Sequence, residues 1–363
     1  MRCLLICLCC CACFVQACAP GSTDSSQKSA FDATGGKVLQ KELPAGTQLA
    51  VAFYNVENLF DTKDNPQTND QDFLPEGRYQ WTEENLDIKL SNLASVIGKI
   101  GEGGPALLGV AEVENRDVLT RLASHELIRS KNYEIVHDDS PDERGIDVGF
   151  IYDPEVFQLK GYEPLIVSKS DQPGFKTREI LMVNGEVNKL PVYVFINHWP
   201  SRREGKMESQ PNRLAAAHTL RKKVDEVRKN FQEVGIIIMG DFNDDPIDTS
   251  IKDALGAQTS MAALEEDALY NATFDLFNPD NSGSLTYKGK WNLFDQIILS
   301  EDLMDGEHSL SYMPQSAKVY KAENIRVPNR KTKFVPRRAI FRGEFQEDGY
   351  SDHFPVYLKL YVN

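Results

Sequence analysis

Acidic, amide and imidazole side chains follow the ends of strand-like segments in this sequence. The clearest case is the stretch GIIIMGDFNDDP, in which the apolar run Ile236 to Met239 leads through Gly240 to Asp241 and Asn243. Residues just past strands commonly carry function on a rigid scaffold. Carboxylates and imidazoles held in this way are groups that proteins use for general acid and base catalysis.

A turn is the simpler interpretation of such a stretch, because Asp, Asn and Pro all favour turns. We favour a turn for the segment Asp244 to Pro246. For Asp241 and Asn243 the stretch alone leaves both interpretations open. We expect Gly240 to let the backbone turn tightly. We also expect Asp241 and Asn243 to face the same side of an extended segment, because they are two residues apart.

The same pattern recurs along the chain, and a series of unrelated turns explains it poorly. Five further strand-like segments end in comparable groups or carry them. In a layered sheet such ends can meet at one rim, so we expect these side chains to converge. The five segments are Asn55-Val56-Glu57-Asn58, Glu112-Val113-Glu114-Asn115, Asn197-His198, Asp295 and Ser351-Asp352-His353.

Strands and helices alternate over residues 49–363. A helix is expected to begin after the capping residue Thr82, with acidic residues in its first turn. Its apolar face carries Leu86, Leu90, Leu93, Ile97 and Ile100. A second helix is expected over residues 214–231. The expected strands are 49–54, 106–111, 147–152, 236–239, 293–299 and 355–362, with a hairpin of 180–183 and 191–196 around Asn184-Gly185.

This mixture of hairpins and crossovers favours the α/β class. We expect a four-layer α/β sandwich in which two packed mixed β-sheets are flanked by helices. No linker interrupts the range, so the sequence predicts one domain over residues 47–363.

The first 17 residues have the pattern of a signal peptide. An apolar segment from Leu4 to Val15 follows Arg2, and it is too short to cross a bilayer as a helix. All seven cysteines lie at or before Cys18. A zinc cluster explains them less well, because zinc ligand pairs normally sit inside a folded module. The predicted domain therefore has neither disulfides nor thiol catalysis.

The segment Val15-Gln16-Ala17-Cys18 resembles a bacterial lipobox, which predicts that Cys18 becomes the lipidated first residue. Plain secretion, with cleavage near Ala17 or Ala19, is the alternative. Residues 18–46 have low hydrophobicity and read as a flexible tether. We therefore expect a lipoprotein of the cell envelope, anchored in the outer or inner membrane and without an obligate protein partner.

The chain is acidic, with 54 Asp and Glu against 40 Lys and Arg and a formal net charge of −14. Such a protein binds polyanions poorly without local basic patches or bound cations. One basic patch is the loop 202–206, and the other is residues 318–342, which contain nine Lys or Arg and one acid, Glu323. The second segment could follow a phosphate backbone or be a solvated loop.

Taken in order, the segments YNVEN, AEVEN, NHWPSRR, GDFND, FDQI and SDH resemble the endonuclease/exonuclease/phosphatase superfamily. This superfamily includes deoxyribonuclease I-like enzymes, abasic-site endonucleases, neutral sphingomyelinases and inositol-phosphate phosphatases. NHWPSRR and RGIDVGFIYD are similar to a bacterial secreted or envelope subgroup. The resemblance implies metal-dependent hydrolysis of a phosphate ester with one or two Mg²⁺ or Mn²⁺ ions bound through oxygen ligands.

The resemblance also implies a metal site. Glu112 is then the principal ligand, with Asn55 and Asp352 close to the metal. Glu57 is a weaker candidate for the same site. Without the resemblance, Glu112 could be an acid that caps a surface helix.

The catalytic roles follow from the same comparison. Asp241 matches the residue that orients or deprotonates the attacking water, and Asn243 matches an amide that holds a phosphoryl oxygen. His353 matches a histidine that binds the phosphate and transfers protons, and Asp295 matches the acid that fixes its tautomer. His198 resembles a second histidine of the deoxyribonuclease branch and is a candidate general acid. The acid partner expected for His198 has no recognisable match.

Contact with the substrate phosphate is predicted for Arg144, Asn197, Arg202 and Arg203. Arg144 could instead form an ion pair with Asp142 or Glu143. Trp199 is a candidate for stacking on a base or sugar, although a Trp beside a proline is as often a packing residue.

The sequence therefore predicts a divalent-metal-dependent phosphodiesterase, an extracytoplasmic nuclease that cleaves DNA or RNA by in-line attack of an activated water. The alternative within the fold is an esterase acting on sphingomyelin-like phospholipids or on small sugar or inositol phosphates. A non-catalytic surface binding module is the alternative of another class, and the complete catalytic set disfavours it.

Overall fold

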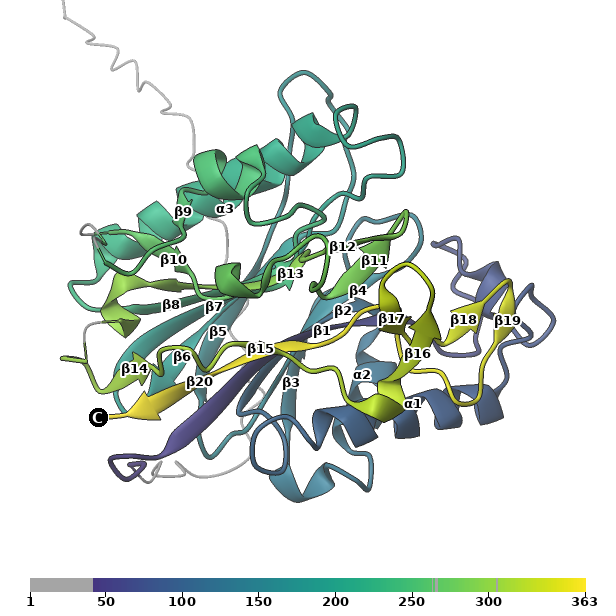
Figure 1. Cartoon of the computed structure of the whole chain (residues 1–363), viewed down its shortest axis with the longest axis horizontal. Coiled ribbons are helices and arrows are strands. Elements are labelled where there is room, and N and C mark those ends of the chain that lie inside the picture. The colour runs from purple at the N-terminus through teal and green to yellow at the C-terminus, as the bar shows by residue number, and fades with distance from the viewer. Residues whose placement is uncertain (1–41, 263, 265–266, 305) are drawn as a thin grey trace, which may run out of the picture.

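The computed structural model describes residues 42–262, 264, 267–304 and 306–363. The predicted signal peptide, the lipidation site Cys18 and nearly all of the tether lie outside these residues. Two β-sheets pack face to face, and helices cover their outer faces (Figure 1). This arrangement confirms the predicted four-layer α/β sandwich.

The first sheet has the strand order β14-β20-β1-β2-β4-β3, with β15 alongside β20. It is mixed, because β1 is parallel to β2 and the other pairs are antiparallel. The strands are β14 (Leu310–Tyr312), β20 (Val356–Val362), β1 (Gln48–Leu59), β2 (Leu107–Val113), β4 (Asp147–Tyr152), β3 (Glu134–His137) and β15 (Lys318–Val319).

The second sheet has the order β5-β6-β7-β8-β13-β10-β9 and is also mixed, since β7 is parallel to β8 and β9 is parallel to β10. The strands are β5 (Gln158–Leu165), β6 (Ile180–Val187), β7 (Leu190–His198), β8 (Gly235–Asp241), β13 (Asp295–Ser300), β10 (Leu269–Asn271) and β9 (Ala257–Gln258).

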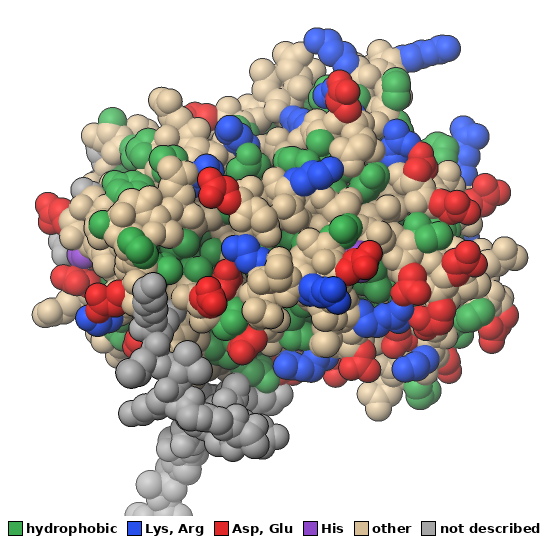
Figure 2. Space-filling model, turned by 90° about the horizontal axis from the view of Figure 1, so that it is seen from below, with side chains coloured by type: hydrophobic (Ala, Val, Ile, Leu, Met, Phe, Trp, Pro, Cys, Tyr) green, Lys and Arg blue, Asp and Glu red, His purple; other side chains and the backbone are tan. Residues whose placement is uncertain are grey.

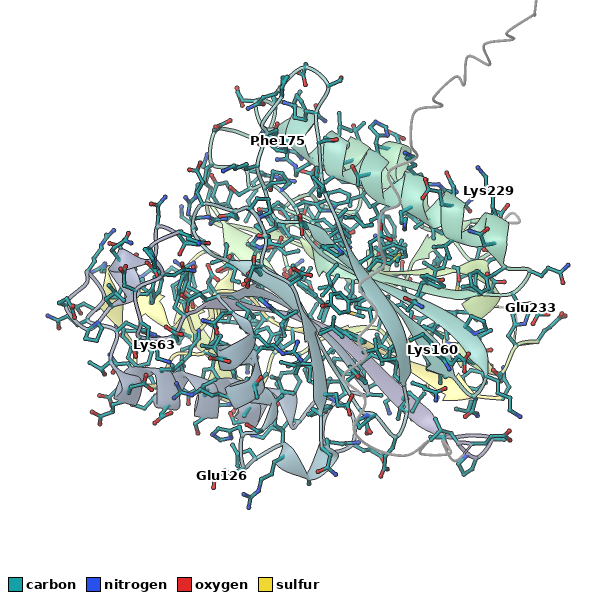
Figure 3. All side chains as sticks on the ribbon, turned by 180° about the vertical axis from the view of Figure 1, so that it is seen from behind. Lys63, Glu126, Lys160, Phe175, Lys229 and Glu233 are labelled. Carbon is teal, nitrogen blue, oxygen red and sulfur yellow. The ribbon has the colours of Figure 1, made fainter. Side chains whose placement is uncertain are left out.

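Helices α1 (Glu83–Ile97) and α2 (Arg116–Ala123) cover the first sheet, and the long helix α3 (Gln210–Asn230) covers the second. In Figure 3 the label Lys229 marks the C-terminal end of α3, and the label Phe175 marks the loop between β5 and β6. The Thr82 hydroxyl caps α1 by accepting a hydrogen bond from the Asn85 N–H at 3.2 Å, as predicted. Short helical turns at Gln71–Phe73, Arg129–Lys131, Ser250–Ala254, Phe274–Leu276, Glu301–Leu303 and Glu323–Ile325 connect the elements. None of the described helices has the length and apolar character that a membrane crossing would need.

Alternation along the strands builds three apolar layers between the four structural layers. In β8, Ile237 and Met239 face the core between the sheets, while Ile236 and Ile238 face α3. Burial of such side chains contributes roughly 1.5–3 kcal/mol each. The strand that leads into GDFN is therefore a rigid support, packed on both faces.

The hairpin turn between β6 and β7 differs from the prediction. The turn lies at Asn188 and Lys189, whose φ angles are 47° and 70°, as a two-residue turn of this kind requires. Gly185 lies within β6, where a Cβ atom would come 2.4 Å from the Phe157 ring. This glycine therefore serves close packing, and the Asn184-Gly185 pair forms no turn.

Three small hairpins lie together beyond one end of the two sheets (Figure 1). They pair β11 (Leu285–Tyr287) with β12 (Lys290–Asn292), β16 (Arg326–Asn329) with β17 (Lys333–Pro336), and β18 (Ile340–Phe341) with β19 (Glu344–Phe345). Acidic and basic side chains are intermingled on the face that Figure 2 shows, so the net negative charge forms no single field there.

Candidate active site

Polar strand ends of both sheets meet at one rim of the sandwich. In the second sheet, Asp241 of β8 lies opposite His198 of β7 and Asp295 of β13. In the first sheet, Asn55 of β1 lies beside the end of β2, which carries Glu112. The Asn55 amide nitrogen donates to Asp241 Oδ2 at 3.1 Å and so joins the two sheets. The predicted convergence of these strand ends is confirmed.

Four residues at these strand ends have positive φ angles, which non-glycine residues rarely adopt. They are Glu57 (φ 52°), Asn58 (φ 54°), Glu112 (φ 65°) and Asn243 (φ 50°). In β1 and β2 they coincide with register shifts, which re-aim the side chains. The expected extended geometry of Asp241 and Asn243 is wrong, because the Asn243 N–H turns back to donate to Asp241 Oδ1 at 3.0 Å.

Glu112 and Asp352 form the carboxylate edge of the site. Glu112 Oε1 accepts a hydrogen bond from the Asn55 amide at 3.2 Å, and its Oε2 accepts one from the Asn58 N–H at 3.0 Å. The side chains of Glu112 and Asp352 are 18% and 30% exposed to solvent, respectively. Accessible oxygen donors of this kind fit a hard divalent cation. Glu112 and Asp352 are therefore suited to contact one. Asn55 is fully buried, and its amide oxygen accepts a hydrogen bond from the Glu57 N–H at 3.0 Å. The metal site of Glu112, Asn55 and Asp352 stays a prediction.

Glu57, which was predicted near the metal, holds a neighbouring segment instead. Its Oε2 accepts a hydrogen bond from the Ala339 N–H at 2.6 Å, and its Oε1 accepts one from Ile340 at 3.4 Å. Burial, together with repulsion from Asp352, raises the pKa of Glu57 to about 8. The prediction of a metal contact is corrected to a positioning role.

A buried cation that the sequence analysis missed lies beneath the carboxylate edge. Lys89 of α1 is fully buried, and its ammonium group donates to the Tyr350 carbonyl at 2.6 Å. Burial lowers the pKa of Lys89 to about 8, although Glu57 and Asp352 oppose the change. A signal was available, because Lys89 stands on the apolar stripe three residues after Leu86.

Asp241 is at the centre of the site and is 2% exposed. Burial raises its pKa to about 6, although His353 works in the opposite direction. Asp241, Asp295 and His353 form a compact group whose ligand-capable atoms all lie within 4.8 Å of one another. A carboxylate in this state can accept a proton near neutral pH.

His353 is paired with an acid from the other sheet. Its Nδ1 lies 2.7 Å from Asp295 Oδ2, and its Nε2 lies 3.8 Å from Asp241 Oδ2. Burial alone would lower the pKa of His353, but Asp295, Asp241 and Asp352 raise it well above the usual range. The predicted pairing of Asp295 with His353 is confirmed.

His198 faces the same carboxylate from the opposite side. Its Nε2 lies 3.8 Å from Asp241 Oδ2 and 4.0 Å from Glu112 Oε1. Its buried Nδ1 has no hydrogen-bond partner among the described residues. Burial, then the charges of Arg178 and Arg144, lower the pKa of His198 well below the usual range. The imidazole is therefore neutral near pH 7. A general acid must carry the proton that it donates, so this state conflicts with the predicted role of His198.

Arg178 is the second functional residue that the sequence analysis missed. Its guanidinium group is buried and donates to the carbonyls of His198 at 3.0 Å and Trp199 at 2.6 Å. It also pairs with Asp142 at 2.9 Å, which in turn binds Arg144. Arg178 thus fixes the backbone that carries His198. No local pattern marks it, because its partners are distant in sequence.

Asn243 is 9% exposed, and its amide nitrogen donates to the Trp199 carbonyl at 3.0 Å. A side-chain amide has a second N–H donor, which leaves one for a substrate oxygen. Trp199 itself is 1% exposed and packs edge-on against Phe242, with ring centroids 4.8 Å apart. Trp199 is therefore a packing residue and cannot stack on a base.

The predicted contact of Asn197 with phosphate is wrong, because the residue is fully buried. Its amide donates to the carbonyls of Phe195 and Met239 and accepts from the Trp199 indole. At Gly240 a Cβ atom would come 2.5 Å from the Asn197 Cβ atom. Gly240 therefore allows two neighbouring strands to approach, and it makes no tight turn beside substrate.

The predicted phosphate contact of Arg202 is also wrong. Its guanidinium group turns inward, donates to the Asn243 carbonyl at 2.6 Å, and pairs with Asp244 at 2.7 Å and Asp248 at 2.6 Å. It also lies 4.4 Å from the centre of the Phe294 ring. Because all these partners belong to the protein, Arg202 braces the loop that carries Asn243.

The two other basic candidates remain open to substrate. Arg144 forms the anticipated ion pair with Asp142 at 3.1 Å, yet its side chain is 34% exposed. With Lys169 and Lys176 it lines a groove of about 750 Å³. Arg203 is exposed on the loop that follows β7. Their contacts with phosphate stay predictions.

The acidic residues after GDFN are structural, as the turn interpretation suggested. Asp244 pairs with the buried Arg213 at 2.8 Å and accepts a hydrogen bond from Ser250 at 2.5 Å. Asp245 Oδ1 accepts from the Leu293 N–H at 2.9 Å. These contacts tie the loop to the sandwich.

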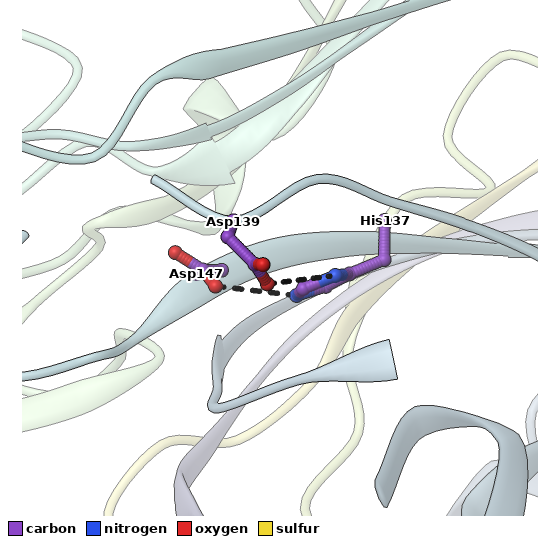
Figure 4. A group of neighbouring side chains, drawn as sticks. All are labelled: His137, Asp139 and Asp147. Atoms are coloured by element: carbon purple, nitrogen blue, oxygen red, sulfur yellow. Dashed lines mark ion pairs between the residues drawn. The ribbon is translucent and has the colours of Figure 1, made fainter. Parts of the chain in front are cut away.

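A second histidine and acid group lies where β3 ends and β4 begins (Figure 4). His137 Nε2 is 3.3 Å from Asp147, and its Nδ1 is 3.8 Å from Asp139. One ligand-capable atom of each residue lies within 4.8 Å of the others, although the two carboxylates pair with different ring nitrogens. Asp147 also accepts from the Ser140 N–H at 2.9 Å. The group anchors the loop that carries Arg144.

The chain belongs to the Endonuclease/Exonuclease/phosphatase family, whose model matches residues 50–362. Enzymes of this family hydrolyse phosphodiester or phosphoester bonds with divalent metal ions, and this chain is accordingly a metal-dependent phosphoric ester hydrolase. The comparison with curated proteins finds no sequence match.

Solved structures share the fold at low sequence identity. A humanized D. rerio TDP2 with 14 mutations has a TM-score of 0.53 at 13% identity, covering 86% of this chain and 98% of its own. A family protein from Bacteroides thetaiotaomicron has a TM-score of 0.51 at 16% identity, covering 88% and 99%. The human Nocturnin catalytic domain with bound sulfate has a TM-score of 0.51 at 15% identity, covering 87% and 95%.

Proposed function

We propose that the protein is an extracytoplasmic nuclease that hydrolyses phosphodiester bonds in DNA or RNA. The observation that carries the proposal is the buried Asp241, with one imidazole on each side at 3.8 Å and the carboxylate edge beside it. The leader sequence and lipobox-like segment support a location in the envelope. The basic segment 318–342 reaches the site, because its Arg338 contacts Asp352 at 3.2 Å. The positive charge of this segment supports a polyanionic substrate.

Each group has a separate task in this proposal. Asp241 accepts a proton from the attacking water, since its raised pKa makes it a base near neutral pH. The charged His353 and the amide of Asn243 donate hydrogen bonds to the phosphoryl oxygens. A divalent cation held by Glu112, Asn55 and Asp352 would neutralise charge on the phosphate. His198, kept neutral by its burial and by Arg178, lies on the opposite side of Asp241 and faces the leaving oxygen.

The test is hydrolysis of plasmid DNA, RNA, sphingomyelin and a chromogenic phosphodiester, each with Mg²⁺ or Mn²⁺ and with EDTA. We expect cleavage of nucleic acid that EDTA abolishes and added metal restores. Asn243→Ala and His353→Ala should each lower the rate about 10²–10³-fold, the effect of removing one donor to a developing charge. His218→Ala, on the exposed face of α3, is the matched histidine control. Full nucleic acid cleavage by either site variant would refute the assignment.

The same experiment separates the alternatives. Hydrolysis of sphingomyelin or small phosphoesters without nucleic acid cleavage would identify the esterase alternative. An absence of metal-dependent turnover on every phosphoester would favour a binding module on this fold.

A further inference from the structure

A cavity of about 510 Å³ lies among the three small hairpins, beside the carboxylate edge. We propose that it binds the nucleobase of the nucleotide next to the cleaved bond, an inference that rests on the proposed nuclease function. The wall residues that carry the argument are Val327, Val335, Pro336, Arg338, Phe341 and Asp352.

The position of the cavity connects it to the reacting phosphate. Asp352 lines the cavity and is also part of the carboxylate edge. It precedes His353, and the two side chains lie 4.0 Å apart. Arg338 pairs with Asp352 at 3.2 Å and brings a guanidinium group to the same boundary. A base attached through one sugar to a phosphate at His353 would therefore reach this cavity.

The lining suits a flat aromatic heterocycle. Val327, Val335 and Pro336 form an apolar wall, and the Phe341 side chain is among the most exposed large apolar groups, at 48%. The Arg342 guanidinium lies 5.2 Å from the centre of the Phe341 ring. Aromatic rings and guanidinium planes are the groups on which proteins stack unpaired bases.

Polar side chains of the cavity add hydrogen-bonding capacity. Asn329, Gln346 and Thr286 also line it, and amides can donate to and accept from the edge of a base. An acyl chain would leave these groups unpaired, which is costly once water is excluded. The surrounding segment 318–342, with nine cations and one acid, further favours a polyanion over a neutral lipid.

The walls are held in place by the sandwich. Glu57 binds the Ala339 N–H at 2.6 Å, and Lys89 binds the Tyr350 carbonyl at 2.6 Å. Asn92 of α1 donates to the carbonyls of Glu347 and Gly349 at 2.8 Å. A cavity fixed in this way requires little ordering when a ligand enters. These contacts explain why buried polar residues of β1 and α1 reach across to the hairpins.

The test compares ligands with and without a base. Calorimetric titration of the full-chain protein with AMP, dTMP and ribose 5-phosphate should show nucleotides binding about tenfold more tightly than the sugar phosphate, the effect expected of one stacked base. Phe341→Ala and Val335→Glu should bring the nucleotides to the level of ribose 5-phosphate. Phe231→Ala, which removes an exposed ring at the end of α3, should preserve the difference.

Unchanged affinity for ribose 5-phosphate shows that each variant is folded and keeps its phosphate site. Equal affinity of the wild type for all three ligands, or a base preference that survives both cavity variants, would overturn the proposal. Loss of binding to sphingomyelin vesicles in Phe341→Ala, with no nucleotide preference in the wild type, would assign the cavity to a lipid instead. Nucleic acid cleavage without a base preference refutes only the cavity, whereas an absence of cleavage refutes the nuclease function itself.

Discussion

His353 and His198 lie on opposite sides of Asp241 at the same distance, 3.8 Å, yet their surroundings are opposite in charge. His353 has Asp295 on its other nitrogen, and this acid raises its pKa. His198 has no acid there among the described residues, and burial beside Arg178 lowers its pKa. One carboxylate is thus flanked by a charged and a neutral imidazole.

This difference in pKa indicates that the two histidines have different roles. Environments that push the pKa values of neighbouring groups apart allow acid and base roles to coexist at one pH. The charged ring can bind an anionic phosphoryl group, while the neutral ring adds no repulsion toward Arg178. Both sheets contribute to the charged side, because Asp295 comes from the second sheet while His353 precedes the last strand of the first.

The largest effect should come from removing the acid on the charged side. Asp295→Asn keeps the shape of the side chain but withdraws the negative charge, so the pKa of His353 should fall. We expect kcat to drop by about 10²–10⁴-fold, the range attributed to a positioned acid–base group. Titration of the imidazole signals by NMR should show the lower pKa directly. Asp253→Asn, an exposed acid, is the control. An unchanged His353 pKa would show that Asp241 and Asp352 suffice to hold its charge.

A smaller effect is expected on the neutral side, from Arg178. Arg178→Ala removes the donors to the His198 and Trp199 carbonyls and leaves Asp142 without one partner. We expect a loss of stability of about 3 kcal/mol from breaking a buried pair and a fall in kcat/KM of up to about 10²-fold from misplacement of His198. The pKa of His198 should rise, because a nearby cation has gone.

Arg178→Lys sharpens this test by separating charge from geometry. Lysine keeps the positive charge, but a single ammonium group cannot reproduce the fork of donors. The pKa of His198 should then stay low while kcat/KM still falls. Equal kcat/KM in the lysine variant and the wild type would show that the cation acts only through its charge. Arg121→Ala, which removes a half-exposed ion pair on α2, is the matched control.

The sequence was sufficient for helices α1 and α3, for most of the long strands and for the polar residues at the strand ends. It did not predict α2, β3, β5 or the three small hairpins. Strands such as β8 show their two-residue alternation directly, and the polar groups that follow them recur in a fixed order. The hairpin turn was misplaced because packing of Gly185 against Phe157 outweighs the local Asn-Gly signal. A local turn preference is weak compared with tertiary contacts of this kind.

The buried cations of the site could not be predicted in the same way. Arg178 acts on carbonyls some 20 residues away and on Asp142, and Lys89 on a carbonyl 261 residues away. No local spacing encodes such pairs. The errors at Asn197 and Arg202 have the same origin. Long-range tertiary contacts decide whether a polar side chain faces substrate or the protein interior, and these contacts form only when the chain folds.

The smallest expected effect is on the pH dependence of stability. It compares Asp142, on the His198 side, with His353 on the other side of Asp241. Burial alone would raise the pKa of Asp142, but Arg178 and Arg144 lower it to about 2, against about 3.9 in an unfolded chain. The resulting stability is present above about pH 4 and is lost as the pH falls toward 2; it amounts to roughly 2–3 kcal/mol. Stability from the raised pKa of His353 has the opposite sign, being present at low pH and lost as the pH rises through the folded value. Denaturant unfolding of the wild type and Asp142→Asn at pH 6 and pH 2.5 should therefore show their difference shrinking in acid. A constant difference would mean that the charge of Asp142 does not stabilise the His198 side.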